Sequence, residues 1–378
     1  MRWNFIKRGA LLLILGTSLF GCAELGYYAQ AVRGQLSIAT SGRPIAEVLQ
    51  DEKTSPQLRQ RLESSQRIRS FASRELALPD NASYRQYVAL DRPFALWNVV
   101  AAPELSLQPL RWCFPVAGCV SYRGYYDEAA AREFAAQLRN QGYDVQVSGV
   151  PAYSTLGWFS DPLLSSFINY PEPELARLIF HELAHQVLYI SGDSQFNESF
   201  ATAVELAGIT RWLACEGDEA QRQRYAKSQQ RNQEFLALIR QQRAALAQAY
   251  SELPNDEEKR AAKQRILQEL QSKYAELKQS WGGYAGYDRW FSSAPGNAHF
   301  AAVNTYHEYV PGFTTLLQQQ GQYADFYRAA KSLAQLPADE RKQQLQQLGK
   351  MVQAPLANPA LEIAPCPNKA ATQSALHK

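Results

Sequence analysis

The chain contains 378 residues, of which 20% are charged, and its formal net charge is only +3. A charge this small and evenly spread predicts no nucleic-acid partner. The length suffices for one large domain or two modest ones, and the patterns below predict an α+β, mainly helical fold. No segment after residue 21 is apolar enough to predict a membrane-spanning helix.

Residues 1–21 have the features of an export signal, because basic residues precede an apolar run too short to span a bilayer. The run ends before Cys22 in a pattern that resembles a bacterial lipobox, in which the cysteine becomes the lipid-bearing N-terminus. Phe20 departs from that pattern, and an ordinary secretory signal is the alternative. We predict a lipid anchor at Cys22 that holds the chain on a bacterial membrane, facing the periplasm. Since Ala23 rather than Asp follows the cysteine, the resemblance favours the outer membrane.

The remaining cysteines are even in number, and an exported compartment is oxidising, so we predict disulfides. A metal site built from them is disfavoured because no CxxC spacing is present. Three pairings are possible. We favour Cys113 with Cys119, which closes a small loop, and Cys215 with Cys366, which ties down the C-terminal tail.

The first half of the chain predicts helices followed by a small sheet. Tyr28, Val32 and Leu36 have helical spacing, and the alternation of apolar residues later in the segment is typical of strands. The expected elements are helices over residues 44–53, 56–76 and 128–140, and strands over residues 95–102, 112–122 and 143–150.

The pattern richest in chemistry is His181-Glu182-Leu183-Ala184-His185, within a helix predicted from Pro173 to about Ile190. Residues four apart lie on one face of a helix, so the two histidines can hold one metal ion. Glu182 lies beside the first histidine and can act as general base toward water. Both histidines lie opposite the apolar stripe of this helix, which predicts that they face a cleft rather than the core.

A second helix is predicted from Asp193 or Ser194 to about Leu213, and it carries Glu198. A turn at residues 192–193 would fold it back onto the first helix and make Glu198 the third ligand. Three protein ligands of the His₂Glu type predict catalytic Zn²⁺, which lowers the pKa of water to about 7.

Glu205 lies two turns beyond Glu198 on the same face of the predicted second helix. It is expected to orient a ligand histidine through the free ring nitrogen. The alternatives are a surface glutamate and a replacement third ligand.

Residues 218–281 predict two long polar helices joined at Pro254-Asn255-Asp256, as an insertion in a domain over residues 22–355. Such a hairpin can be a lid, a spacer or a packing arm. After a loop over residues 282–299, one helix is expected over residues 301–318 despite Pro311. Residues 356–378 are expected to form an extended tail.

Two further segments are candidates for contacts with a substrate. Tyr306 and His307 can donate hydrogen bonds to a developing oxyanion, although a buried tyrosine with an ordinary hydrogen bond is the alternative for Tyr306. Residues 149–158 can form a substrate wall or an ordinary connecting loop.

Residues 112–125, 152–159, 180–186 and 196–201 together resemble a bacterial family of predicted aminopeptidases. The resemblance covers roughly residues 25–350. It implies a zincin-like, zinc-dependent metallopeptidase of the gluzincin type, often lipid-anchored, with His181, His185 and Glu198 as ligands and Glu182 as base. The run Asn-Glu-Ser-Phe-Ala is also similar to the NEGFA-type aminopeptidases. Its spacing from His185 is shorter, and the GxMEN-type motif that binds a substrate amino terminus is absent.

The leading hypothesis is therefore a membrane-anchored zinc peptidase acting on peptides or proteins, with exopeptidase and endopeptidase action both open. A second hypothesis is a non-catalytic lipoprotein with a structural zinc site, whose hairpin binds a partner. Glu182 argues against it, because a structural site has no use for a general base. A third hypothesis is a zinc hydrolase of another bond, such as a cell-wall amide. The sequence makes no prediction of oligomeric state.

Overall fold

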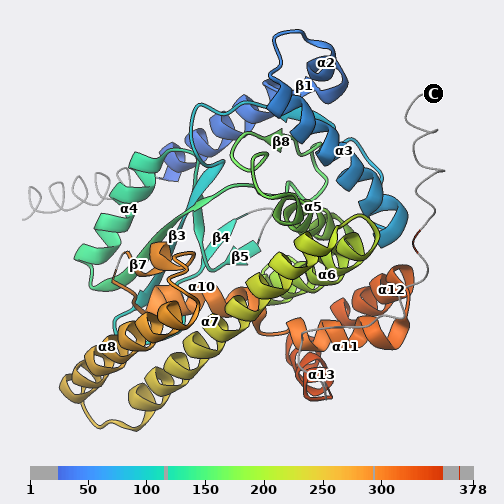
Figure 1. Cartoon of the computed structure of the whole chain (residues 1–378). Helices are drawn as coiled ribbons and strands as arrows, with labels where there is room; N and C mark the ends of the chain where they lie inside the picture. The colour runs from blue at the N-terminus through green and yellow to red at the C-terminus, as the bar shows by residue number, and fades with distance from the viewer. Residues whose placement is uncertain (1–23, 115–117, 293, 352–365, 367–378) are drawn as a thin grey trace, which may run out of the picture.

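The structure is a computed structural model that describes residues 24–114, 118–292 and 294–351, together with Cys366 (Figure 1). The expected signal peptide, Cys22 and the expected extended tail apart from Cys366 lie outside the described residues. The fold is α+β and mainly helical, as predicted, and the described residues form three small sheets. Within the described ranges, no helix combines the length and the apolar character that crossing a bilayer requires.

The N-terminal part of the chain forms a helical border on one side of the molecule. A helix over residues 24–40, here called the N-terminal helix, precedes β1 (Arg43–Pro44), α2 (Ile45–Gln50) and α3 (Pro56–Leu76). Ser55 caps α3 by accepting a hydrogen bond from the Leu58 N–H, and Pro56 lies in its first turn. The predicted bounds of α3 are confirmed, whereas α2 is shorter than predicted.

The largest sheet is antiparallel, in the order β6 (Arg123–Tyr125), β3 (Leu96–Pro103), β7 (Tyr143–Val150). Val99 pairs with Val147 in β7, and α4 (Glu128–Asn140) packs on the sheet. The bounds predicted for α4 and β7 are confirmed. A second sheet has the order β1, β2 (Gln86–Val88), β8 (Leu163–Leu164).

The segment predicted as a single strand over residues 112–122 is instead a hairpin of β4 (Trp112–Phe114) and β5 (Gly118–Val120). The Cys113–Cys119 disulfide joins its two strands. The prediction was wrong because the chain reverses between the two cysteines. The other predicted pairing, Cys215 with Cys366, is also present.

Helices α5 (Glu172–Val187) and α6 (Ser194–Cys215) form the centre of the molecule. Helix α5 ends three residues earlier than predicted, and the segment after it is fixed by Asn197. The Asn197 side chain accepts the Ile190 N–H at 2.8 Å and donates to the Ile190 carbonyl at 2.8 Å. Asp193 caps α6, and Gly192 adopts a positive φ of 83°. These contacts fold α6 back along α5.

The polar hairpin consists of α7 (Glu219–Glu252) and α8 (Asp256–Ser280), with Asn255 as the cap of α8. It projects from the body of the molecule in Figure 1, but its apolar seam is buried together with residues outside the hairpin, such as Phe300 of the segment that follows. Phe235 packs in this seam, stacked on Tyr287 near α9 (Asp288–Phe291). Lys263 of α8 lies 2.8 Å from Asp144 of β7, which joins the hairpin to the sheet.

The single helix predicted over residues 301–318 is wrong. The chain forms α10 (Asn297–His307) and α11 (Val310–Gln320), and Pro311 lies in the first turn of α11. Proline has no N–H to continue the preceding helix, which explains the break. Two helices that the sequence did not predict, α12 (Tyr323–Ala334) and α13 (Ala338–Lys350), follow.

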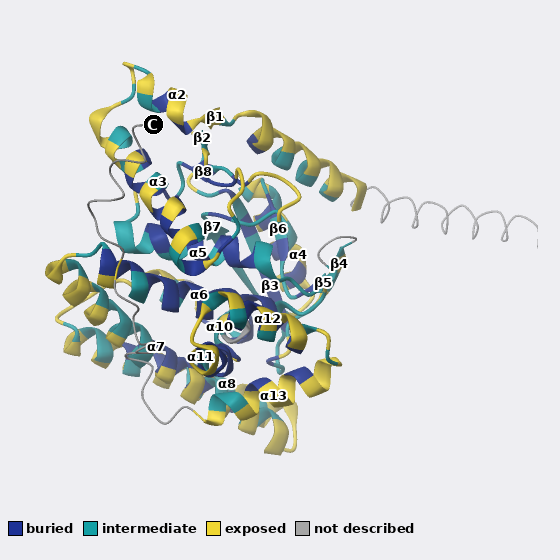
Figure 2. Ribbon diagram, turned by 90° about the vertical axis from the view of Figure 1, so that its right-hand side faces the viewer, coloured by how far each residue is buried: buried dark blue, intermediate teal, exposed yellow. Residues whose placement is uncertain are grey.

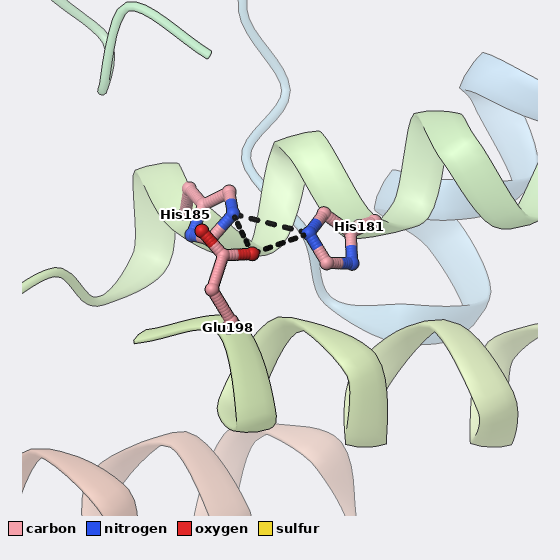
Figure 3. Close-up of side chains that lie close together, drawn as sticks. All are labelled: His181, His185 and Glu198. Atoms are coloured by element: carbon pink, nitrogen blue, oxygen red, sulfur yellow. Dashed lines mark hydrogen bonds and ion pairs between the residues drawn. The ribbon is translucent and has the colours of Figure 1, made fainter. Parts of the chain in front are cut away.

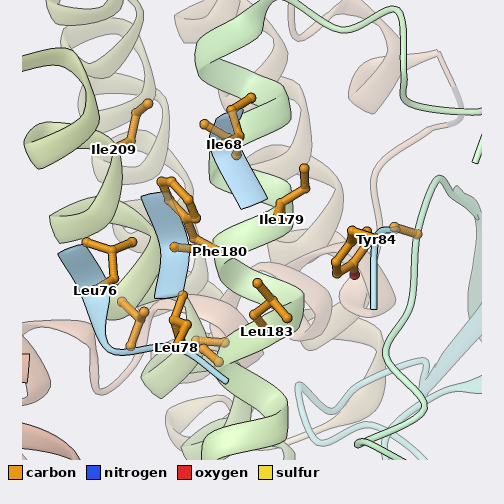
Figure 4. Close-up of a cluster of buried hydrophobic side chains, with 14 of the residues drawn as sticks. Ile68, Leu76, Leu78, Tyr84, Ile179, Phe180, Leu183 and Ile209 are labelled. Carbon is orange, nitrogen blue, oxygen red and sulfur yellow. The ribbon is translucent and has the colours of Figure 1, made fainter. Parts of the chain in front are cut away.

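The largest hydrophobic core lies between α3, α5 and α6, where large side chains from the three helices interlock (Figure 4). Phe180 of α5 is fully buried, and its ring centroid lies 6.1 Å from that of Phe71. Phe71 also makes an edge contact with Trp212 of α6. This core fixes the rotation of α5 and therefore the direction of its opposite face.

Replacing Phe180 by alanine is expected to lower the free energy of unfolding by about 3–5 kcal/mol, because it removes a buried ring and leaves a cavity. Phe159→Ala is the control, since Phe159 is 53% exposed, and a change within about 0.5 kcal/mol is expected there. Denaturant unfolding measures both. Equal effects of the two substitutions would contradict this description of the core.

Candidate active site

The two histidines of the HExxH pattern lie on the face of α5 that turns away from the α3 core. Their side chains point toward Glu198, which α6 brings across from the other side (Figure 3). His185 and Glu198 are buried, and His181 is mostly buried. The structure therefore brings together the three residues that the sequence predicts as metal ligands, in the cleft that the helical pattern predicts.

The distances among these three side chains fit one small metal ion. His181 Nε2 lies 3.2 Å from His185 Nε2 and 3.2 Å from Glu198 Oε2, and the third distance, from His185 Nε2 to Glu198 Oε2, is 3.6 Å. Tetrahedral zinc with bonds of ~2.1 Å places neighbouring ligand atoms roughly 3.4 Å apart. The donor set, two imidazoles and one carboxylate, is also one that catalytic zinc uses. The residues present thus fit the ion.

Glu205 lies on the other side of the His181 ring. Its Oε2 is 2.9 Å from His181 Nδ1, so the carboxylate accepts that N–H and leaves Nε2 free to face Glu198. Glu205 is 7% exposed, which excludes the alternative of a surface glutamate. Its position at Nδ1 also separates it from the three converging ligand atoms. The arrangement favours the expectation that Glu205 orients a ligand histidine.

Arg177 holds Glu205 in place. Its Nη2 lies 2.7 Å from Glu205 Oε1, and its Nη1 lies 2.8 Å from Glu174. Burial alone would raise the pKa of Glu205, but Arg177 and His181 hold it down at about 2. The sequence analysis missed Arg177. A signal was present, because Arg177 precedes His181 by four residues and so shares its face of the helix.

The ionisable groups at the centre of the cleft shift one another's pKa values. Burial would raise the pKa of Glu198, yet His185 and His181 lower it to about 2. Burial would lower the pKa of His181, but Glu198 and Glu205 raise it well above its usual value. Burial raises the pKa of Glu182 to about 7, against the opposing effect of the two histidines. The negative potential of these carboxylates favours a cation between the histidines.

The cleft around these residues has a volume of about 580 Å³. Its walls come from the large sheet, through Leu96, Asn98 and Gly124, and from the loop after β7. The segment predicted as a wall over residues 149–158 does line the cleft, through the following residues: Val150, Pro151, Ala152, Tyr153, Ser154 and Leu156.

Asp161 fixes the loop that forms this wall. It is buried and accepts hydrogen bonds from the Thr155 N–H and hydroxyl. It also accepts one from Gln186 Nε2 at 3.0 Å, and Gln186 directly follows His185 in the chain. The loop is thereby attached to the helix that carries the histidines. No local sequence pattern indicates this contact, because 25 positions separate its two partners.

Tyr306 and His307, the residues expected to donate to an oxyanion, line the cleft from α10. The Tyr306 ring lies 6.3 Å from the His181 ring, centroid to centroid, and the side chain is 38% exposed. The carboxylate of Glu198 raises the pKa of Tyr306, so its hydroxyl remains a hydrogen-bond donor. Burial lowers the pKa of His307 to about 4, which keeps its ring neutral.

The structure adds two tyrosines that the sequence analysis did not single out. Tyr122 and Tyr189 line the cleft with Glu198, and burial raises the pKa of both. Tyr122 lies within residues 112–125, the cysteine-containing segment that resembles the aminopeptidase family, and that resemblance was the available signal. Tyr189 lies four residues after His185, and the two ring centroids are 6.4 Å apart, so the helical spacing was the available signal.

The fold and this geometry define a mainly helical α+β protein with a buried His₂Glu group that can bind a metal ion. Residues 26–345 match the model of a family described as putative aminopeptidase, and the chain belongs to that family. Searches of curated proteins and of solved structures found no match.

Glu205→Gln is expected to weaken zinc binding about 10–100-fold, because the amide carries no negative charge and has one acceptor oxygen for the two donors, His181 and Arg177. The zinc dissociation constant can be measured by competition with a chelating dye. The exposed Glu276 on α8 offers the same substitution far from the cleft as a control. Wild-type affinity in Glu205→Gln would show that His181 is oriented without this contact.

Proposed function

We propose that the protein is a zinc-dependent peptidase that hydrolyses peptide bonds in this cleft, with His181, His185 and Glu198 as the zinc ligands. The observation that carries the proposal is the convergence of these three side chains beside Glu182 in a chain of the aminopeptidase family. The family description supports aminopeptidase action among the possible peptidase activities.

A zinc ion bound there would supply a Lewis acid that acidifies water and polarises a peptide carbonyl. Glu182 is buried, lines the cleft and follows the first histidine directly. Its carboxylate would accept a proton from the attacking water and pass it to the nitrogen of the leaving amine. Glu205 and Arg177 would keep His181 in the tautomer whose Nε2 can bind the ion.

Tyr306 and His307, both on α10, would supply hydrogen bonds from the wall of the cleft. The Tyr306 hydroxyl is a donor, and its ring lies next to that of His181. Charge develops on the carbonyl oxygen as water attacks, and a donor aimed at that oxygen stabilises the transition state more than the substrate.

We also propose that the protein acts from a membrane surface that faces the periplasm, with a lipid anchor at Cys22. The lipobox-like sequence and the two disulfides support this location, because disulfides persist in oxidising compartments. Peptides or proteins in that compartment would be the substrates.

Glu182→Gln is expected to reduce peptide hydrolysis by at least about 10²-fold, since the amide cannot accept a proton. The zinc content should stay at the wild-type level because the ligands are unchanged. Hydrolysis of a panel of peptides with free and blocked amino termini measures the effect. Full activity in Glu182→Gln would exclude this residue as the base, and Glu276→Gln controls for the substitution itself.

Tyr306→Phe is expected to lower kcat by roughly 10²–10³-fold with little change in KM, because the lost hydrogen bond forms in the transition state. Tyr284→Phe is a matched control, since Tyr284 is 39% exposed and lies outside the residues that line the cleft. An unchanged kcat in Tyr306→Phe would assign Tyr306 to packing alone.

A further inference from the structure

The N-terminal helix has an apolar face that no described part of the protein covers. Leu25, Val32 and Leu36 are 72%, 57% and 53% exposed, and Tyr28 is 39% exposed. Their spacings of three, four and four residues place them on one side of the helix. Figure 2 shows exposed residues along the outer side of this helix. A continuous row of exposed apolar side chains indicates a binding surface.

The opposite face of the same helix is firmly attached to the body of the protein. Gln30 Oε1 accepts the Tyr126 N–H at 2.9 Å, and Gln35 Oε1 accepts the hydroxyls of Tyr126 and Tyr153 at 2.9 and 2.6 Å. Ile38 is 2% exposed in the main core. The inner face of the helix is therefore held by the body of the protein, and the apolar row on the other face points outward.

The close fit at Gly34 confirms how tightly this inner face packs. A Cβ added at Gly34 would lie 2.1 Å from Cγ of Tyr126. Rotation of the helix to bury its apolar row against the body would require this contact to be remade. The row is thus available to an external partner rather than to the rest of the fold.

Two observations identify that partner as a lipid bilayer. First, the helix begins two residues after Cys22, the site predicted to carry the lipid anchor, so an anchored chain holds this helix at the membrane surface. Second, Glu24, the acidic residue of the helix, lies 3.1 Å from Arg123, and the basic residue Arg33 suits anionic headgroups. Arg33 is exposed and lies next to the apolar row.

We propose that the N-terminal helix lies flat in the membrane interface, with Leu25, Tyr28, Val32 and Leu36 inserted among the lipids. The proposal rests on the location proposed above but not on the peptidase activity. An apolar helix face beside a lipid chain gives the two attachments that fix an orientation as well as an anchor. Tyr153, which donates to Gln35 of this helix, also lines the cleft. The orientation of the helix therefore sets how the cleft lies relative to the membrane.

A fluorescent label at position 32 tests the contact in the full chain. The four later cysteines are paired in disulfides and Cys22 is expected to carry lipid, so Val32→Cys adds a reactive thiol, and the unsubstituted chain is the blank. Glu276→Cys is the control, because Glu276 is exposed on α8, outside the N-terminal helix. The vesicles contain phosphatidylethanolamine and phosphatidylglycerol, with a lipid-borne quencher in a second set.

Addition of vesicles is expected to shift the emission of the label at position 32 to shorter wavelength and to make it accessible to the quencher, with neither change at position 276. Leu36→Cys repeats the test at a second position. Equal, water-exposed emission at positions 32 and 276 on vesicles would overturn the proposal. A label at position 32 that is already shielded without vesicles would also overturn it, in favour of a second copy of the chain. Peptide hydrolysis by the labelled proteins is a separate readout, so loss of the proposed activity leaves the membrane result intact.

Discussion

The free-energy cost of burying carboxylates close together is the constraint on which the arrangement of the cleft depends. Glu182, Glu198 and Glu205 are each less than 10% exposed and lie around the same two histidines. A buried ion without a partner costs several kcal/mol, so each carboxylate needs a cation or a hydrogen-bond donor. Arg177 and His181 meet this need for Glu205. The remaining negative charge lies where the two Nε2 atoms converge, which is where a divalent cation would bind.

The fold supplies this arrangement by giving α5 and α6 two different faces. Phe180 and its neighbours attach one face of α5 to α3, and Asn197 holds the turn that leads into α6. The polar faces of both helices then point into the same cleft. Gln186 extends the effect, because its contact with Asp161 attaches the cleft wall to α5 as well. The residues that carry chemistry are thus positioned by contacts on both sides of one helix.

Much of this could be predicted from sequence where the determinants are local. The bounds of α3, α4 and β7 follow from caps and periodicity, and the HExxH spacing brings His181 and His185 to one face. Glu198 could be predicted as a ligand because Gly192 and Asp193 indicate a turn that folds the second helix back onto the first. The same helical spacing places Arg177 on the face of His181. The role of Arg177, however, depends on its bond to Glu205, which lies 28 positions away.

Other features depend on contacts between distant segments and could not be predicted. Pro311 marks the break between α10 and α11 locally, but the burial of Phe313 of α11 in the main core depends on contacts with distant segments. The buried seam of the α7–α8 hairpin requires Phe300 from α10, which no local pattern assigns to it. The hairpin is therefore a packed part of the protein rather than an isolated polar arm.

The metal content of the purified protein tests the central claim most directly, with wild type measured beside Glu198→Ala by elemental analysis. About one zinc ion per chain in the wild type, lost in Glu198→Ala, is the predicted result. Zinc retained at the same stoichiometry in Glu198→Ala would contradict the assignment of Glu198 as a ligand. Absence of bound zinc in the wild type, even after incubation with zinc, would contradict the metal centre itself.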